Sequence, residues 1–442
     1  MSSKPCTLCV GCGRCETYQA DIKVLTKGGL PSELATLPCD VYGQAFSQDE
    51  LLVCVDIGTT TVAMTLRRLS GGEIVDTYTS LNPQREFGSD VLSRMEKKDF
   101  AKEMRRLIEE TIWQGVCQMG AEYIEQIKGV IITGNTTMLY LLRGRDTEEL
   151  SHAPFQASFL EQEVFDFHGL RTIVMPGISA FVGADVLAGM FALSMDECLR
   201  NEVWDSKILQ GAILLDLGTN GEMVYAGPEG LIATATPAAP AYEGGGFGEQ
   251  IYGADYVSLL AYLLEQGYMD ETGLLIDPYF EEGIVVADKR ITQQDIRRLQ
   301  LAKGATRAGL QILTKDTPVS VVYLAGGFGF FLDGDKAVRI GLLPEQFAGK
   351  VRAVGNVALE GAFLYGRMVL IQEKNCQIEG LVDNQEIAQR RTTAAQVVCE
   401  YVARLKESTR VINLAMEPDF EKVYLESINF PANEVETNDS DN

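Results

Sequence analysis

The chain has 442 residues, enough for two or three domains with a substantial core, and its apolar and charged fractions are ordinary for a soluble protein. Its formal net charge of −24 argues against nucleic acid and against an anionic membrane surface as partners, because both carry negative charge. The N-terminus lacks the apolar run of a signal peptide, and no stretch approaches the roughly 20 apolar residues of a membrane span, which favours a cytoplasmic location.

A run of cysteines near the N-terminus is the first distinctive feature. The short spacings and the reducing cytoplasm suit metal coordination better than disulfides. The cysteines concerned are Cys6, Cys9, Cys12, Cys15 and Cys39. Three cysteines two residues apart, followed by a more distant one, resemble a bacterial ferredoxin pattern, so residues 1–45 are expected to hold one 4Fe–4S cluster with Cys15 or Cys39 as its fourth ligand. A zinc ion held by four thiolates, or free thiols, are the alternatives.

From residue 51 the chain alternates apolar segments with tight turns, which predicts strands. The first expected antiparallel meander covers residues 51–56, 61–66 and 73–79. The second covers residues 212–216, 222–226 and 231–236. Both meanders have a matching segment where the first strand ends, Asp-Ile-Gly-Thr-Thr-Thr from Asp56 and Asp-Leu-Gly-Thr-Asn-Gly from Asp216. This repetition indicates a duplicated domain.

Two longer segments are expected to be helical. Residues 90–126 are rich in helix formers with apolar residues at helical spacing. Thr292 and Asp295 form the pattern of a capping box, which predicts a helix from there to about Lys315. The last residues, 431–442, are polar and acidic and are expected to be disordered.

The two Asp-x-Gly-Thr turns have a clear chemical use. Glycine lets the backbone approach a phosphate, turn amides and hydroxyls donate to its oxygens, and the aspartate can hold Mg²⁺ through water. Two such hairpins facing each other would grip a triphosphate from both sides. The candidate phosphate-binding residues are Gly58, Thr59, Thr60, Thr61, Gly218, Thr219, Asn220 and Gly221.

A third glycine-rich loop follows the apolar strand expected at residues 319–323. Its glycines would let a flat adenine or ribose lie against the backbone, which makes Gly326, Gly327, Phe328 and Gly329 candidates for nucleoside binding. A dinucleotide-binding Rossmann fold is the obvious competitor, but it requires a helix directly after the glycine loop, whereas a strand follows each Asp-x-Gly turn here. The sequence also contains no P-loop motif.

These three loops resemble the phosphate-1, phosphate-2 and adenosine motifs of the superfamily of acetate and sugar kinases, Hsp70 and actin. Further segments are similar to the ATP-dependent reductive activators of corrinoid proteins, and the likeness covers roughly residues 51–431. The segments are residues 82–94, 133–138, 183–185, 216–222, 291–297, 300–303, 341–344 and 355–356.

The resemblance implies an α/β fold of two actin-like (ribonuclease H-like) lobes with ATP in the interlobe cleft, preceded by the short cysteine-rich metal-binding segment. The expected lobes are residues 46–205 and 206–430. Asp56 and Asp216 would organise Mg²⁺ and the attacking water, Asn135 would join the nucleotide-binding residues, and Glu222 would orient the water or Mg²⁺, although a plain strand glutamate is an equal alternative.

In that family, ATP hydrolysis drives reduction of an inactive Co(II) corrinoid to Co(I). The resemblance therefore implies a corrinoid protein as electron acceptor, an unidentified low-potential donor, and a homodimer as one candidate assembly. The chain departs from the family in having only about 45 residues before the ATPase and a shortened segment after Gly244. A small-molecule kinase, a zinc-bearing nucleotide switch and an activator of 2-hydroxyacyl-CoA dehydratases are the alternatives. The two histidines, His152 and His168, form no recognisable catalytic pattern.

Overall fold

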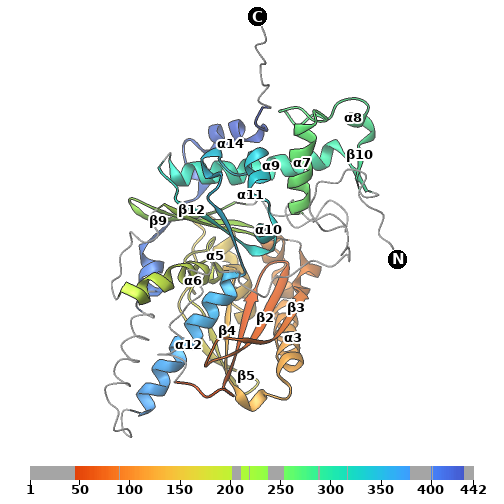
Figure 1. Cartoon of the computed structure of the whole chain (residues 1–442). Helices are drawn as coiled ribbons and strands as arrows, with labels where there is room; N and C mark the ends of the chain where they lie inside the picture. Colours follow the sequence, from red (N-terminus) through yellow and green to blue (C-terminus); the bar gives the residue numbers. More distant parts are fainter. Residues whose placement is uncertain are drawn as a thin grey trace, which may run out of the picture.

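The computed structural model describes residues 45–88, 90–201, 211–218, 220–236, 253–286, 289–315, 317–378, 400 and 402–432. Within these residues the chain forms two lobes, each built on a six-stranded sheet. Figure 1 shows the lobe with β2 and β4 below the lobe with β9 and β12.

The sheet of lobe I has the strand order β3-β2-β1-β4-β6-β5. Its strands are β1 (Leu51–Ile57), β2 (Thr61–Arg68), β3 (Ile74–Leu81), β4 (Ile127–Gly134), β5 (Glu163–Phe167) and β6 (Leu170–Val174). The first three pair antiparallel, which confirms the predicted meander, and β4 lies parallel to β1. All of β1 except Asp56 is buried, because the strand is covered on both faces.

The sheet of lobe II repeats this plan with the order β13-β12-β7-β8-β9-β14. Its strands are β7 (Ala212–Leu217), β8 (Gly221–Gly227), β9 (Gly230–Thr236), β12 (Val321–Ala325), β13 (Val351–Gly355) and β14 (Thr409–Val411). The strands β7, β8 and β9 form the second predicted meander, and β12 lies parallel to β7 as β4 lies parallel to β1. The two central strands, β1 and β7, therefore occupy equivalent places.

Two long helices pack against each other and against the central strands: α6 (Ala184–Asn201) and α12 (Val357–Ile378). Although α12 follows β13 of lobe II, it packs on β1 and β4, and its apolar residues belong to the core of lobe I. The core of lobe I therefore includes a helix that follows the lobe II strand β13 in the chain. The helix α12 thus connects the sheet of lobe II to the core of lobe I.

The remaining helices cover the outer faces. Lobe I carries α2 (Val91–Met95), α3 (Ala101–Gly120), α4 (Thr136–Arg143), α5 (Glu148–Ser151) and the 3-10 helices η1 (Pro83–Phe87), η2 (Lys98–Phe100) and η3 (Ile124–Gln126). Lobe II carries α7 (Gly253–Glu265), α8 (Tyr279–Glu282), α9 (Gln293–Thr314), α10 (Gly326–Phe331), α11 (Gly334–Arg339), α14 (Phe420–Ile428), the hairpin β10 (Ile284–Val286) and β11 (Lys289–Ile291), η5 (Glu345–Phe347) and η6 (Leu414–Met416).

The helical structure expected over residues 90–126 is confirmed, but it is divided into α2, η2, α3 and η3. Asp90 and Ser93 form a capping box that starts the short α2, and Lys97 then leaves the helical region with φ −90° and ψ 50° before α3 begins at Ala101. This break turns Arg94 and Met95 into the interior. The second helix prediction is confirmed, because Thr292 and Asp295 cap α9 reciprocally.

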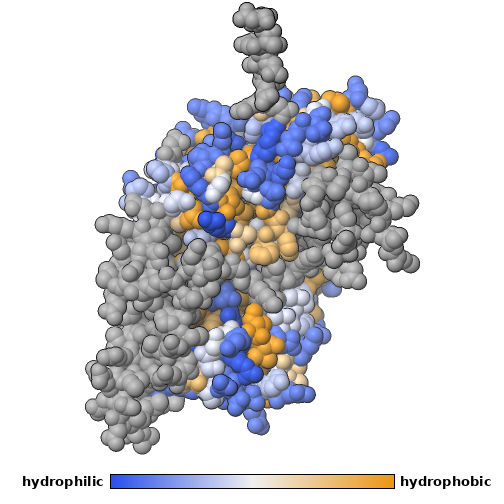
Figure 2. Space-filling view, in the orientation of Figure 1, coloured by the Kyte–Doolittle hydropathy of each residue, from blue (hydrophilic) through white to orange (hydrophobic). Residues whose placement is uncertain are grey.

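The described surface is mainly hydrophilic on the face shown in Figure 2, with apolar residues gathering across its middle. Over the described residues, no helix combines the length and the apolar character needed to cross a membrane. Residues 433–442 of the expected acidic tail lie outside the described part of the chain.

Candidate nucleotide site between the two hairpins

The two Asp-x-Gly hairpins form as the sequence predicts, at equivalent ends of the two central strands. In lobe I, Gly58 N donates to Thr61 O at 2.9 Å and closes the turn between β1 and β2. In lobe II, Gly218 N donates to Asn220 O at 3.0 Å between β7 and β8. Thr219 lies outside the described residues.

Four carboxylates from both lobes influence one another at these hairpins. Burial raises the pKa of Asp56 to about 6, and burial together with the charge of Asp56 raises the pKa of Asp216 to about 7. The pKa of Glu222, on β8, is raised by burial and by the charges of Asp185 and Asp216. Buried like charges repel, so this arrangement favours either bound protons or a bound cation.

The fourth carboxylate, Asp185, was not among the predicted catalytic residues. It stands in the first turn of α6, where one of its oxygens accepts from Val186 N at 2.8 Å. Burial and the charges of Asp56 and Asp216 raise its pKa to about 8. The Gly183-Ala184-Asp185 segment resembled the activator family, and that resemblance was the signal that pointed to this position.

Asp56 has a specific partner from the other end of the chain. Asn356, between β13 and α12, donates its Nδ2 to Asp56 Oδ2 at 2.9 Å and lowers the pKa of that carboxyl against the effect of burial. Its Oδ1 accepts from Leu359 N at 2.9 Å, so the same side chain begins α12. Asn356 therefore joins a strand end of lobe II to the carboxylate of lobe I.

The third glycine-rich segment begins the short helix α10 instead of forming an open loop. Gly326 has φ +77°, and a Cβ there would lie 2.5 Å from Asp216 Oδ1, so only glycine allows this approach. The segment therefore lies against the second hairpin. Phe328 and Gly329 are buried, and the Phe328 ring packs in the core of lobe II.

Asn135 lies next to the first hairpin as the N-cap of α4. Its Oδ1 accepts from Thr137 N at 3.0 Å, and its backbone N donates to Ile57 O at 3.4 Å. Thr59 and Thr60 are almost fully buried in this conformation. The structure thus brings Asn135 beside the residues predicted to bind phosphate.

The predicted metal ligands Cys6, Cys9, Cys12, Cys15 and Cys39 all lie outside the described residues. Within the described part of the chain, no group of three or more Asp, Glu, His or Cys side chains is close enough to hold a metal ion directly.

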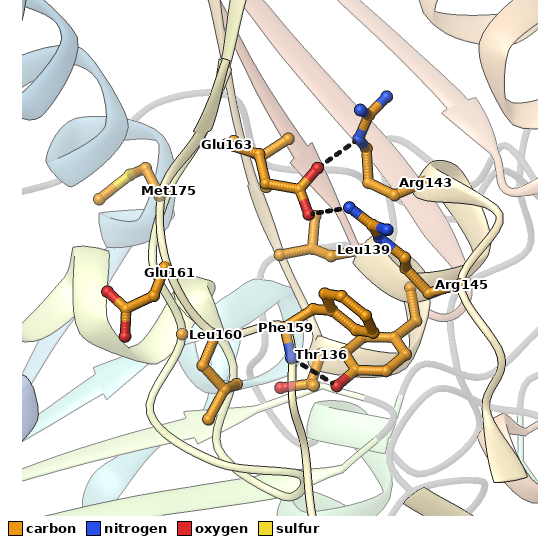
Figure 3. Close-up of a pocket in the computed structure, with 12 residues that line it drawn as sticks. Thr136, Leu139, Arg143, Arg145, Phe159, Leu160, Glu161, Glu163 and Met175 are labelled. Carbon is orange, nitrogen blue, oxygen red and sulfur yellow. Dashed lines mark hydrogen bonds and ion pairs between the residues drawn. The ribbon is translucent and has the colours of Figure 1, made fainter. Parts of the chain in front are cut away.

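A separate pocket in lobe I adjoins α4 (Figure 3). Arg143 Nε and Arg145 Nη2 both contact the carboxylate of Glu163, at 2.8 and 2.9 Å, and Phe159 N donates to Tyr140 Oη at 2.9 Å. These side chains pair with one another across the pocket. None of the four carboxylates at the hairpins lines it.

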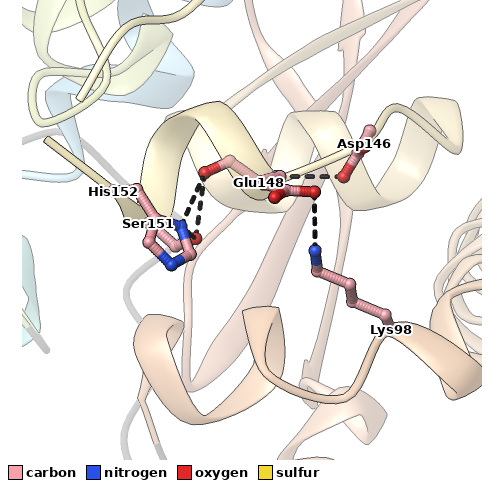
Figure 4. A network of polar contacts seen from close by, with 5 residues as sticks. All are labelled: Lys98, Asp146, Glu148, Ser151 and His152. Atoms are coloured by element: carbon pink, nitrogen blue, oxygen red, sulfur yellow. Dashed lines mark hydrogen bonds and ion pairs between the residues drawn. The ribbon is translucent and has the colours of Figure 1, made fainter. Parts of the chain in front are cut away.

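Both histidines take part in local contacts in lobe I. His152 Nδ1 lies 2.8 Å from Ser151 Oγ and 3.2 Å from Glu148 O, beside the ion pair of Lys98 and Glu148 (Figure 4). The His168 ring stacks on Trp113 with centroids 4.1 Å apart.

Comparison with known proteins agrees with this architecture. A family model described as the RACo middle region matches residues 51–198, and one described as the C-terminal ASKHA domain of RACo matches residues 249–394. The curated corrinoid activation enzyme RamQ of Eubacterium limosum is 26% identical over 472 residues, covering 89% of this chain and 71% of RamQ. A solved reductive activator for corrinoid, iron-sulfur protein is 25% identical with a TM-score of 0.69, covering 88% of this chain and 67% of that one.

The fold and the paired hairpins define an ATP-binding protein of the ASKHA class, with two actin-like lobes. The two matching models describe successive regions of one kind of protein and together span well over half of the chain. The chain belongs to the RACo family of ATP-dependent reductive activators.

Proposed function

We propose that this chain hydrolyses ATP between its two hairpins and uses that hydrolysis to drive reduction of a corrinoid protein from Co(II) to Co(I). The observation that carries the proposal is the set of four carboxylates, contributed by both lobes, whose charges act on one another at the glycine-rich hairpins. The likeness to a corrinoid activation enzyme and to a reductive activator supports the choice of acceptor.

Different residues at the hairpins bind the phosphates and the nucleoside of ATP. The phosphates are bound by backbone and hydroxyl groups of both turns. These are Gly58, Thr59, Thr60 and Thr61 in the first and Gly218, Thr219, Asn220 and Gly221 in the second. The nucleoside lies against the third glycine-rich segment, formed by Gly326, Gly327, Phe328 and Gly329. Asn135 joins the residues that bind the phosphates. Phosphoryl transfer to water requires mainly such positioning and neutralisation of charge.

Asp56 and Asp216 would hold hydrated Mg²⁺ from opposite lobes, and we add Asp185 to them because the charges of both aspartates act on it. Mg²⁺ supplies positive charge that neutralises the phosphate oxygens and offsets the repulsion among the carboxylates. Glu222 orients the attacking water. Burial and the charges of Asp185 and Asp216 raise the pKa of Glu222, which strengthens it as an acceptor of a proton from that water.

The cysteine segment provides the redox part of the proposal. Four of the five cysteines would supply the thiolates for one 4Fe–4S cluster, because their spacing resembles a ferredoxin run and thiolates are the usual ligands of iron–sulfur clusters. The five are Cys6, Cys9, Cys12, Cys15 and Cys39. Bound to these thiolates, such a cluster would carry one electron at a time, and one electron is what the reduction of Co(II) to Co(I) in the acceptor requires. The electron comes from a low-potential donor protein.

The lobes, residues 46–205 and 206–430, are proposed to approach each other when ATP binds, as two-lobed ATPases commonly close on their ligand. Because α12 joins the lobe I core from within the second range, closure would move the lobe II sheet relative to α12. A homodimer and a cytoplasmic location are proposed from the sequence.

Anaerobic purification with iron and sulfide analysis tests the redox part, and ATP-dependent appearance of Co(I) absorbance in a candidate corrinoid protein tests the coupling. We expect about four iron atoms per chain and no Co(I) when ATP is withheld. Zinc in place of iron, or phosphorylation of a small metabolite without corrinoid reduction, would contradict the proposal.

A further inference from the structure

Three backbone carbonyls of the first hairpin are held by side chains and backbone from the segment that follows β3. Asn82 Nδ2 donates to Gly58 O at 2.9 Å, and Asn82 N donates to Thr60 O at 2.8 Å. Arg94 Nη2 donates to Thr59 O at 2.5 Å. Every carbonyl of the turn from Gly58 to Thr60 is thus engaged by one of two residues.

Both residues are fixed in place by further contacts. Asn82 is 1% exposed, and its Oδ1 accepts from Gln84 N at 3.0 Å, which begins η1. Arg94 is fully buried, and its Nε donates to Gly88 O at 2.9 Å while Nη1 lies 3.1 Å from Met138 Sδ. A planar guanidinium with several donors can hold three such partners at once.

Holding these carbonyls sets the direction of the turn's amides. In a trans peptide the C=O of one residue and the N–H of the next point in opposite directions. The carbonyls of Gly58 and Thr59 point toward Asn82 and Arg94, so the amides of Thr59 and Thr60 point away from them. Arg94 also places a buried positive charge directly behind the turn, and buried charges act strongly because they are little screened.

We propose that Asn82 and Arg94 are positioning residues that orient the first hairpin for the phosphates of ATP. They touch the hairpin from behind and act through its backbone. This inference deepens the proposed function and rests on it. It gives residues 82–94 a physical role that the sequence alone did not provide.

The test compares affinity for a non-hydrolysable ATP analogue with affinity for adenosine, because adenosine lacks the phosphates that the hairpin would bind. Arg94→Met removes the charge and the N–H donors of the guanidinium but keeps an apolar side chain of similar length. Arg94→Lys keeps the charge but loses the planar set of donors. We expect each to weaken binding of the analogue by about tenfold or more, the size expected from losing a hydrogen bond to a charged group. Affinity for adenosine should stay within about twofold, since that ligand would not contact the hairpin.

Arg106→Met is the matched control, because Arg106 is an exposed arginine on α3 that pairs with Glu103 and Glu110. It should leave both affinities unchanged. Asn82→Ala provides a second variant if the arginine variants do not fold, and it should show the same selective loss. A circular-dichroism melt establishes that each variant is folded.

Equal weakening for the analogue and adenosine, or no weakening for either, would overturn the positioning role while leaving the proposed function intact. Wild-type protein that binds neither ligand would overturn the proposed function, and this inference with it. A selective loss for the triphosphate analogue supports both.

Discussion

The two hairpins share a sequence pattern but are stabilised in different ways. The first is held by polar side chains that arrive from elsewhere, with Asn82 and Arg94 behind its carbonyls and Asn356 on its aspartate. The second lies against backbone, because Gly326 approaches Asp216 so closely that a methyl group would clash. The two hairpins therefore share the turn, while the residues around them differ. The first hairpin should be sensitive to lost hydrogen bonds and the second to added volume.

The largest expected effect removes either aspartate. Asp56→Ala and Asp216→Ala should each reduce ATP turnover by about 10²–10³-fold, the cost of losing a group that stabilises transition-state charge. A phosphate-release assay measures this, and absorbance of the iron–sulfur cluster should not change. Asp76→Ala, at an exposed position of β3, is the control. Loss of activity in only one of the two variants would mean that the hairpins do not serve one nucleotide.

Adding volume at the second hairpin should have the next largest effect. Gly326→Ala places a Cβ 2.5 Å from Asp216 Oδ1, and Gly326 also has a positive φ. Gly349→Ala is a matched control, since Gly349 has φ +72° with no atom within 4 Å of the added Cβ. Both variants should lose about 1–2 kcal/mol of unfolding free energy from backbone strain, measured by urea denaturation.

Only Gly326→Ala should also lose ATP turnover, by about tenfold, because it displaces a carboxylate that binds the cation. Equal turnover in the two glycine variants would show that the approach of α10 to Asp216 is unimportant for the reaction.

The repulsion among the carboxylates predicts an unusual pH dependence of stability without nucleotide and Mg²⁺. The folded pKa values of Asp56, Asp216 and Asp185 are raised to about 6, 7 and 8. A raised carboxyl pKa contributes stability that is fully present below the unfolded pKa near 3.9 and is lost as pH rises through the folded pKa.

The melting temperature should therefore fall between pH 5 and pH 8, and Mg²⁺ with an ATP analogue should reduce that fall. Asp185→Asn should reduce the loss of unfolding free energy over this pH interval by about 1 kcal/mol or more, because an amide carries no charge to bury. A melting temperature that rises over this interval in the wild type would contradict the assignment of these carboxylates to one group.

Local patterns in the sequence predicted the hairpins well, because alternation, glycine turns and the Thr292 capping box are properties of neighbouring residues. The parts that sequence missed depend on distant contacts. Asp185 and Asn356 act on the first aspartate only after α6 and α12 pack together, so resemblance to a family marks these positions but no local pattern gives their roles.

The break between α2 and α3 shows the same limit on a smaller scale. Helix formers continue through residues 90–126, but burying Arg94 behind the hairpin requires the chain to turn there. Tertiary contacts thus override helix propensity at this segment.

The smallest expected effect concerns the asparagine on the first aspartate. Asn356→Ser can keep the cap of α12 but is too short to reach Asp56 as Asn356 does. Losing a hydrogen bond to the ionised carboxyl should raise the pKa of Asp56 and move the acid limb of the ATPase pH profile upward by about half to one unit. An unchanged or lowered acid limb would show that Asp56 does not control that limb.

A crystal structure with a non-hydrolysable ATP analogue and Mg²⁺ tests the central claim most directly. The account predicts one nucleotide whose phosphates contact the turns at Gly58 and Gly218 together, with Asp56 and Asp216 facing the same hydrated cation. A nucleotide bound by one hairpin alone, or a triphosphate held elsewhere in the molecule, would contradict it.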